Sequence, residues 1–192
     1  MLLFSHDTSA ADWIAGSSTR ADQLITFGPD AYGSFARVRF IPDPARPGLT
    51  EADAQVPADH PTNLDHLVRA VEALTPFTGT PDAAFFLVWD SGVSTIAADA
   101  RARSAVHVPH RESFLSEGGL ADLPRWCEDL GLDEYDHPSF IWPADRAWCI
   151  AADVDPHWAG VGATEAAIEA LLGDPGVDSA RADPAQRQPT YY

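Results

Sequence analysis

The stretch AAFFLVWD, from Ala83 to Asp90, decides the fold because it is apolar without interruption up to Trp89. The run is too short for an isolated buried helix, and its aromatic residues favour a strand. Since no polar residue alternates with the apolar ones, both faces of this strand must be buried. We therefore expect the stretch to form a central strand of a sheet.

Further strands are expected on both sides of this run. FARVRFI, from Phe35 to Ile41, alternates apolar residues with arginines, which predicts a strand with one buried face. The short apolar run LITF, from Leu24 to Phe27, predicts another strand that ends at Gly28. The same reasoning predicts short strands over residues 104–109, 113–115, 140–142, 146–154 and 158–162.

Three segments carry helical signals. Thr62 or Asn63 can cap a helix that presents apolar residues at helical spacing up to Leu74. A second helix is expected over residues 121–130, closed by Gly131, and a third begins after Thr164. Because hairpin-like pairs of strands outnumber helices, we expect an α+β fold with a largely antiparallel sheet and about three helices packed on one face.

Two segments lack any period. Residues 42–61 are rich in Pro, Ala and acidic residues and are expected to form a long surface loop. Residues 181–192 are expected to form a loosely held tail after a short strand that begins near Asp178. With 192 residues in total, the chain fits a single domain over residues 1–192.

Charge and composition exclude several classes of function. All 12 basic residues are arginine, so a phosphate-loop lysine, a Schiff-base lysine and a lysine general base are excluded. The formal net charge of -17 opposes binding to nucleic acid, because phosphate groups would be repelled. A basic protein partner fits this charge, and so does a purely solubilising role.

The cysteines and the apolar runs indicate a cytoplasmic protein. Cys127 and Cys149 each follow a tryptophan in an apolar setting, where a reduced thiol is the ordinary state. The N-terminal residues lack the basic segment of a signal peptide, and no apolar run approaches the length of a membrane span. No cofactor-binding motif is recognised, and no nucleic-acid or membrane partner is expected.

Asp153, Asp155 and His157 form the first candidate for a chemical site. They occupy every second position after the apolar strand, so an extended chain would place all three on one face. Two carboxylates and an imidazole could hold Mg²⁺ or Mn²⁺. The structural alternative is that Asp153 lies at the end of a strand and that Asp155 opens a turn with Pro156.

Two further polar groups have weaker motifs. His107 and His110 have a spacing seen at metal sites, but Pro109 between them excludes the helix that such motifs need. Arg37 and Arg39 share one face of a strand and could bind a phosphate or carboxylate. The alternative is that both arginines form ion pairs with nearby acidic residues of the chain.

Six tryptophans occur in the chain, and most adjoin other apolar residues, which indicates the core. Trp13 and Trp158 have the least apolar sequence neighbours. These two are the candidates for anchoring an interface, where tryptophan is enriched.

Several segments together resemble a family of acidic actinobacterial proteins. They are LITFGPDAYGSFARVRFIPDP, TPDAAFFLVWD, VPHRESFL, FIWPADRAWCIAADVDPHWAGVGA and QPTYY, and they cover most of the chain. The most distinctive block is WPADRAWC followed by DVDPHWAGVG. No activity is attached to that family, so the resemblance implies no catalytic residue. The arrangement of the final strands and helix is also similar in style to immunity proteins that neutralise polymorphic toxins.

These observations support two functional hypotheses from different classes. The first is a non-enzymatic acidic binding protein, such as an immunity or antitoxin-like partner of a basic protein. The second is a small metal-dependent hydrolase that uses Asp153, Asp155 and His157, with help from His107 or His110.

Overall fold

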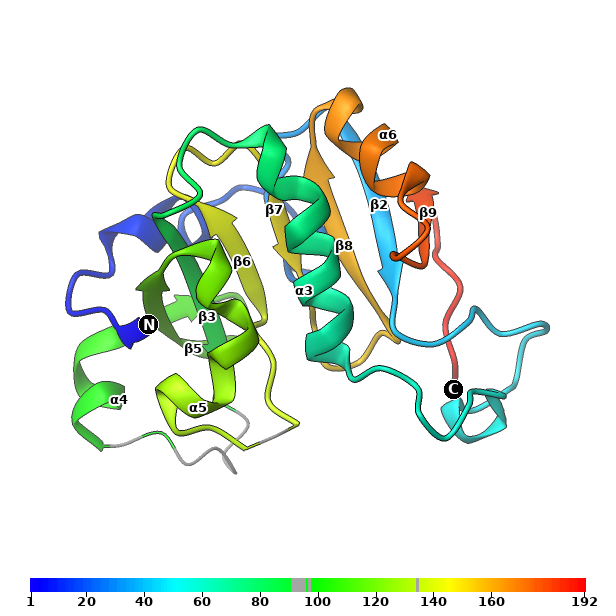
Figure 1. The fold of residues 1–192 in the computed structure, drawn as a ribbon, viewed down its shortest axis with the longest axis horizontal. Coiled ribbons are helices and arrows are strands. Elements are labelled where there is room, and N and C mark those ends of the chain that lie inside the picture. The colour runs from blue at the N-terminus through cyan, green and yellow to red at the C-terminus, as the bar shows by residue number, and fades with distance from the viewer. Residues whose placement is uncertain (91–95, 97, 134) are drawn as a thin grey trace.

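The computed structural model describes residues 1–90, 96, 98–133 and 135–192. These residues form one antiparallel sheet with helices on both faces (Figure 1). The α+β fold class and the antiparallel sheet are therefore confirmed. The expected placement of the helices on one face is wrong.

All recorded strand pairs are antiparallel, and the strand order along the sheet is β1-β5-β3-β6-β7-β8-β2-β9, with β4 paired to β5. The strands are β1 (Leu3–Phe4), β2 (Ser34–Arg39), β3 (Ala84–Trp89), β4 (Ala105–Val108), β5 (Arg111–Gly118), β6 (Phe140–Pro143), β7 (Cys149–Ala151), β8 (Trp158–Ala163) and β9 (Ser179–Ala182).

Six α-helices lie among the described residues, which is more than the three expected. The additional ones are short, and a helix of one or two turns shows too little of the 3.6-residue period to be recognised. The α-helices are α1 (Asp12–Ala15), α2 (Ala21–Phe27), α3 (Asn63–Leu74), α4 (Ala98–Ser104), α5 (Trp126–Leu130) and α6 (Glu165–Gly173). The 3₁₀ helices are η1 (Ser9–Ala11), η2 (Glu51–Asp53), η3 (Thr75–Phe77) and η4 (Leu120–Arg125).

The central-strand prediction for AAFFLVWD is confirmed. β3 pairs with β5 on one side and with β6 on the other, so it is an interior strand. Phe86 and Val88 belong to the core cluster that also contains side chains of α3, α5 and α6, whereas Leu87 belongs to a second cluster that contains side chains of α1 and α2. Because both faces are covered, this strand has no position for a polar residue.

The helix predicted from Thr62 onward is also confirmed. The Thr62 hydroxyl accepts a hydrogen bond from the amide of Asp65, and the Asp65 carboxylate accepts one from the amide of Thr62. This capping box fixes the start of α3. Leu67, Val71 and Leu74 then bury one face of the helix against the sheet.

The strand predicted over Leu24–Phe27 is wrong, because these residues form the last turn of α2. Leu24 and Phe27 are both buried, and they are three residues apart, so they also fit one face of a helix. The helix lies so close to β8 that a Cβ at Gly160 would be 2.1 Å from the carbonyl oxygen of Thr26. A four-residue apolar run cannot distinguish the two periods.

The helix predicted over residues 121–130 is divided in two. η4 is a 3₁₀ helix that contains Pro124, and α5 begins only at Trp126. Pro124 lacks an amide proton, so it cannot donate in a regular helical ladder. Gly131 ends α5 in the left-handed conformation (φ 66°), as the sequence predicts.

None of the described helices reaches the length and hydropathy that crossing a bilayer requires.

Candidate functional site

Asp153 and Asp155 are engaged by Arg111 from β5. An Nη2 atom of Arg111 lies 3.3 Å from Asp153 Oδ1 and 3.6 Å from Asp155 Oδ2. The same guanidinium lies over the ring of Trp89, with its carbon 4.8 Å from the ring centroid. A cation therefore already occupies the space between the two carboxylates, and the ring fixes its position.

His157 contacts Asp43 and not Arg111. Its Nε2 atom lies 3.0 Å from Asp43 Oδ1, and Tyr191 packs edge-on against its ring. The three residues proposed as metal ligands therefore divide between Arg111 and Asp43. Within the described ranges, no group of three or more His, Cys, Asp or Glu side chains could hold a metal ion. No contact in that part of the chain favours the metal-dependent hydrolase.

Among the described residues, neither imidazole of the HVPHRE segment forms a hydrogen bond with Asp153, Asp155 or His157, and only the backbone carbonyl oxygen of His110 contacts the Arg111 guanidinium (3.4 Å). His107 is exposed on β4, opposite Glu112 on β5. His110 occupies the turn between these strands with φ 62°, directly after Pro109. A proline followed by a residue with positive φ is typical of a type II turn. The spacing of the two histidines therefore reflects a hairpin.

Arg37 and Arg39 bind carboxylates of the protein itself. Arg37 is 5% exposed and forms two hydrogen bonds with Asp43, at 2.7 and 3.1 Å. Arg39 lies between Asp43 and Asp178. Together with His157, these residues form what we term the Asp43 cluster: Arg37, Arg39, Asp43, His157 and Asp178. The two arginines therefore pair with carboxylates of this chain, which was the alternative to an anion-binding site.

The protonation of Asp43 reflects its position in this cluster. Its burial opposes ionisation, but hydrogen bonds from Arg37 and His157, and the charges of Arg37 and Arg39, outweigh that effect. The result is a pKa of about 2, below the ordinary value of 3.8. Asp43 therefore carries a full negative charge near neutral pH and fixes both arginines.

The C-terminal residues, expected to be loosely held, contact the loop and the strand beside this cluster. The Tyr191 hydroxyl donates to the carbonyl oxygen of Pro42 (2.7 Å), and the Tyr192 amide donates to that of Leu49 (2.9 Å). The indole of Trp158 donates to the carbonyl oxygen of Pro189 (3.3 Å). The tail thus joins the 42–61 loop to β8.

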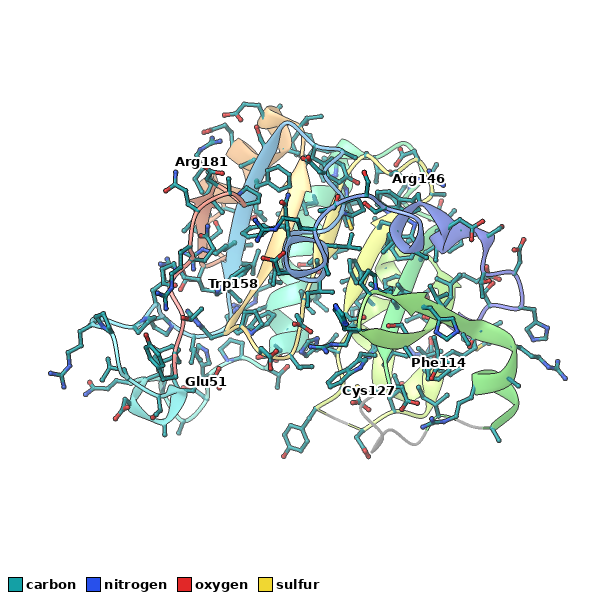
Figure 2. All side chains as sticks on the ribbon, turned by 180° about the vertical axis from the view of Figure 1, so that it is seen from behind. Glu51, Phe114, Cys127, Arg146, Trp158 and Arg181 are labelled. Atoms are coloured by element: carbon teal, nitrogen blue, oxygen red, sulfur yellow. The ribbon has the colours of Figure 1, made fainter. Side chains whose placement is uncertain are left out.

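Neither tryptophan proposed as an interface anchor lies open to solvent. Trp158 is only 3% exposed and packs with Phe27 and Phe35, beside α2 in the view from behind (Figure 2). Trp13 is half-buried, with its ring edge-on to Trp142 and the Arg146 guanidinium above it. Trp158 therefore belongs to the core, and its ring is not exposed for contact with a partner.

His66 is a buried titratable side chain on α3. It is 5% exposed, and its ring lies 5.3 Å from that of His60 and 6.1 Å from that of Phe40. Burial lowers its pKa, and the charges of His60 and Arg69 lower it further, against the smaller opposing effect of Asp178 and Asp65. The fold therefore favours the neutral form of the His66 imidazole.

This pKa predicts a pH dependence of stability. Because His66 accepts a proton more readily in the unfolded chain than in the fold, its contribution to stability is present above the unfolded pKa of about 6.5 and is lost as pH falls toward its lower folded value. We expect a His66→Gln variant to lose less stability than the parent between about pH 7 and about pH 5. Urea unfolding at each pH measures this loss. His107→Gln, at an exposed position, is the matched control, and a parallel pH curve for the His66 variant would contradict the prediction.

An apolar groove between α3 and η4 is the candidate binding site. It encloses about 340 Å³, which is near the lower end of the range for ligand pockets. The lining residues are Val68, Val71, Glu72, Thr75, Pro81, Asp82, Leu120, Ala121, Leu123 and Pro124. Its floor is formed by buried side chains, and its rim by exposed ones such as Ala121 and Pro124.

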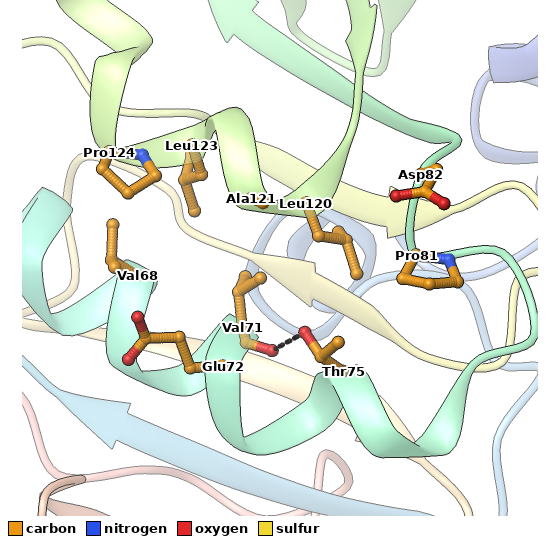
Figure 3. Close-up of a pocket in the computed structure, with 10 residues that line it drawn as sticks. All are labelled: Val68, Val71, Glu72, Thr75, Pro81, Asp82, Leu120, Ala121, Leu123 and Pro124. Carbon is orange, nitrogen blue, oxygen red and sulfur yellow. Dashed lines mark hydrogen bonds between the residues drawn. The ribbon is translucent and has the colours of Figure 1, made fainter.

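The polar groups of the groove are two carboxylates and one hydroxyl. Figure 3 shows Glu72 and Asp82 at opposite ends, with Val71 and Leu120 between them. The Thr75 hydroxyl donates to the carbonyl oxygen of Val71 at 2.7 Å, so it is already satisfied. In the described part of the chain, neither carboxylate has a hydrogen-bonding or ion-pair partner. The groove therefore offers an apolar surface between two free negative charges.

Sequence patterns did not reveal this groove. Val68 and Val71 fit the apolar face of α3, and the same spacing predicts a fully covered helix. Leu120, Ala121 and Leu123 belong to a segment whose 3₁₀ winding was not predicted. The groove depends on how α3 packs against η4, and a local sequence pattern does not predict such packing.

Comparisons with known proteins give no relative: no family model, no curated protein and no solved structure matches this chain.

Proposed function

We propose that this chain is a non-enzymatic, cytoplasmic binding protein whose acidic surface docks on a basic protein. Its most concrete form is an immunity or antitoxin-like partner that covers a basic toxin. The proposal rests on the distribution of charge in the fold.

The observation that carries the proposal is that most arginines are neutralised within the protein. Among the described residues, seven of the 12 arginines form ion pairs with carboxylates, and these are Arg20, Arg37, Arg39, Arg101, Arg111, Arg125 and Arg181. Several exposed acids have no ion pair in the described ranges, among them Glu51, Asp59, Glu72, Asp82 and Glu112. The excess negative charge therefore faces outward.

A surface of this kind favours encounter with a basic protein. Complementary fields raise the rate of association by about 10- to 1,000-fold at low salt, and the effect declines with ionic strength. The same field repels nucleic acid, whose phosphates carry the same sign. A basic protein is therefore the partner that this charge distribution supports.

Affinity capture from the native host tests the proposal. The tagged protein is incubated with cell extract at low salt, the column is washed with rising salt, and the released proteins are identified by mass. We expect a protein of high pI that leaves the column as salt rises, and whose purified form associates more slowly at high salt. Capture of only neutral or acidic proteins, or an association rate that does not respond to salt, would contradict the proposal.

A further inference from the structure

We propose that the groove between α3 and η4 is the docking site, and that it binds a segment of the basic partner in which two aliphatic side chains are flanked by lysine or arginine. This inference rests on the proposed function and adds the place and the chemistry of recognition.

The first argument is the apolar surface that the groove leaves uncovered. Val68 of α3 and Pro81 before β3 are only partly buried, and Ala121 and Pro124 of η4 are exposed. These side chains surround a floor that includes Leu120 and Leu123. Burying apolar surface contributes a favourable free energy of about 25 cal/mol per Å², so aliphatic groups of a partner would be stabilised there.

The size of the groove limits the occupant. Because an α-helix rises about 1.5 Å per residue, the wall that α3 provides from Val68 to Thr75 is about 10 Å long. Two aliphatic side chains from one segment fit this length, since residues four apart on a helix are about 6 Å apart along its axis. A longer apolar segment would extend past the two carboxylates.

The second argument is the complementarity of charge. Glu72 and Asp82 lie at the two ends of the groove (Figure 3), and the lining residues include no basic side chain. Elsewhere, carboxylates such as Asp43 and Asp153 are held by arginines of the chain itself. Free carboxylates at both ends of an apolar groove match a segment with a basic residue on each side of its apolar pair.

Two other hollows of the described surface differ from this groove in their lining. The one formed by the loop and the tail is lined by Arg46 and Arg187, which would repel a basic segment. The one beside β9 is lined by Arg181 together with Asp30 and Glu165, and Arg181 already pairs with Glu165. Of these three hollows, the α3/η4 groove is the one whose described lining contains carboxylates and apolar side chains but no arginine.

A displayed library of random peptides tests the site. The full-length protein is immobilised, bound peptides are enriched and sequenced, and the affinity of enriched peptides is measured for the parent and for variants. We expect enriched peptides to share two aliphatic residues flanked by lysine or arginine. A library that enriches no peptide, or only peptides without basic residues, would overturn the inference.

Two variants locate the binding. Ala121→Phe fills the groove from an exposed position and is expected to weaken binding by at least about tenfold. The double variant Glu72→Arg with Asp82→Arg is expected to weaken it by about tenfold. The matched control, Asp59→Arg with Glu112→Arg, makes the same change of net charge at exposed sites that do not line the groove.

The outcomes distinguish failure of the docking site from failure of the proposed preference for basic partners. Equal weakening by the groove variant and the control double variant would overturn the docking site, yet leave a general preference for basic partners in place. Unchanged affinity in both Ala121→Phe and the Glu72/Asp82 variant would also overturn the site. Urea unfolding of each variant establishes whether it is folded. If Ala121→Phe does not fold, the charge variants still test the site.

Discussion

Replacing Gly160 by alanine is expected to lower the free energy of unfolding by about 3 kcal/mol or more. A Cβ at this position would lie 2.1 Å from the Thr26 carbonyl oxygen and 2.9 Å from the Phe27 Cα atom. Both are backbone atoms of α2, so no side-chain rotation can relieve the overlap. The helix must move away from β8, which opens the core around Phe27 and Trp158.

The matched control for this substitution is Gly173→Ala at the end of α6. A Cβ there would meet no atom within 4 Å, and we expect a change below about 1 kcal/mol. Urea unfolding curves measure both effects. Similar stability of the two variants would show that α2 does not pack on β8 at this distance.

Replacing Asp43 by asparagine is expected to lower the free energy of unfolding by about 3–5 kcal/mol. The substitution leaves the buried guanidinium of Arg37 without its carboxylate, although the cation remains over the ring of Trp158. Arg39 keeps Asp178, whereas His157 loses its charged acceptor. An unpaired buried charge is the main reason for the loss.

The comparison for Asp43 is an ion pair in solvent. Glu169 on α6 contacts Arg181, and both side chains are largely exposed, so Glu169→Gln should change the free energy of unfolding by less than about 1 kcal/mol. A loss of similar size in both variants would contradict the structural role of the Asp43 cluster.

Asp43 also predicts a response to acid. Its folded pKa of about 2 lies below the ordinary value of 3.8, so its contribution to stability is present above the ordinary value and is lost as pH falls toward 2. The Asp43→Asn variant lacks this titration. We expect its stability to vary less with pH in that range, as urea unfolding at each pH would measure.

Long or capped elements were predictable from the sequence. The interior strand β3 follows from an apolar run that has no polar alternation, and α3 follows from a cap at Thr62 or Asn63 and a helical period over three turns. In β2, the alternation of Val38 with Arg37 and Arg39 places the valine in the core and the arginines on the other face. In each case several local signals agree.

Short elements were not predictable in the same way. Leu24 and Phe27 are compatible with a strand and with one helical turn, and only the contact of α2 with Gly160 decides between them. The 3₁₀ winding of η4 also depends on its surroundings. Packing against the sheet outweighs weak local preference in such segments.

The residues of the candidate metal site pair with partners that their spacing in the sequence cannot show. Period-2 spacing brings Asp153, Asp155 and His157 near one another in sequence, but their partners come from distant segments. Arg111 reaches the two carboxylates from β5, and Asp43 reaches the histidine from the loop after β2. Long-range ion pairs of this kind appear only when strands are placed side by side.

The rate at which the captured partner associates with this protein, measured as ionic strength rises, tests the central claim most directly. The account predicts a rate constant that falls by about tenfold or more from low to high salt, because an outward-facing negative surface steers a basic partner. The dissociation rate should change much less. An association rate that is the same at low and high salt would contradict the claim that charge recruits the partner.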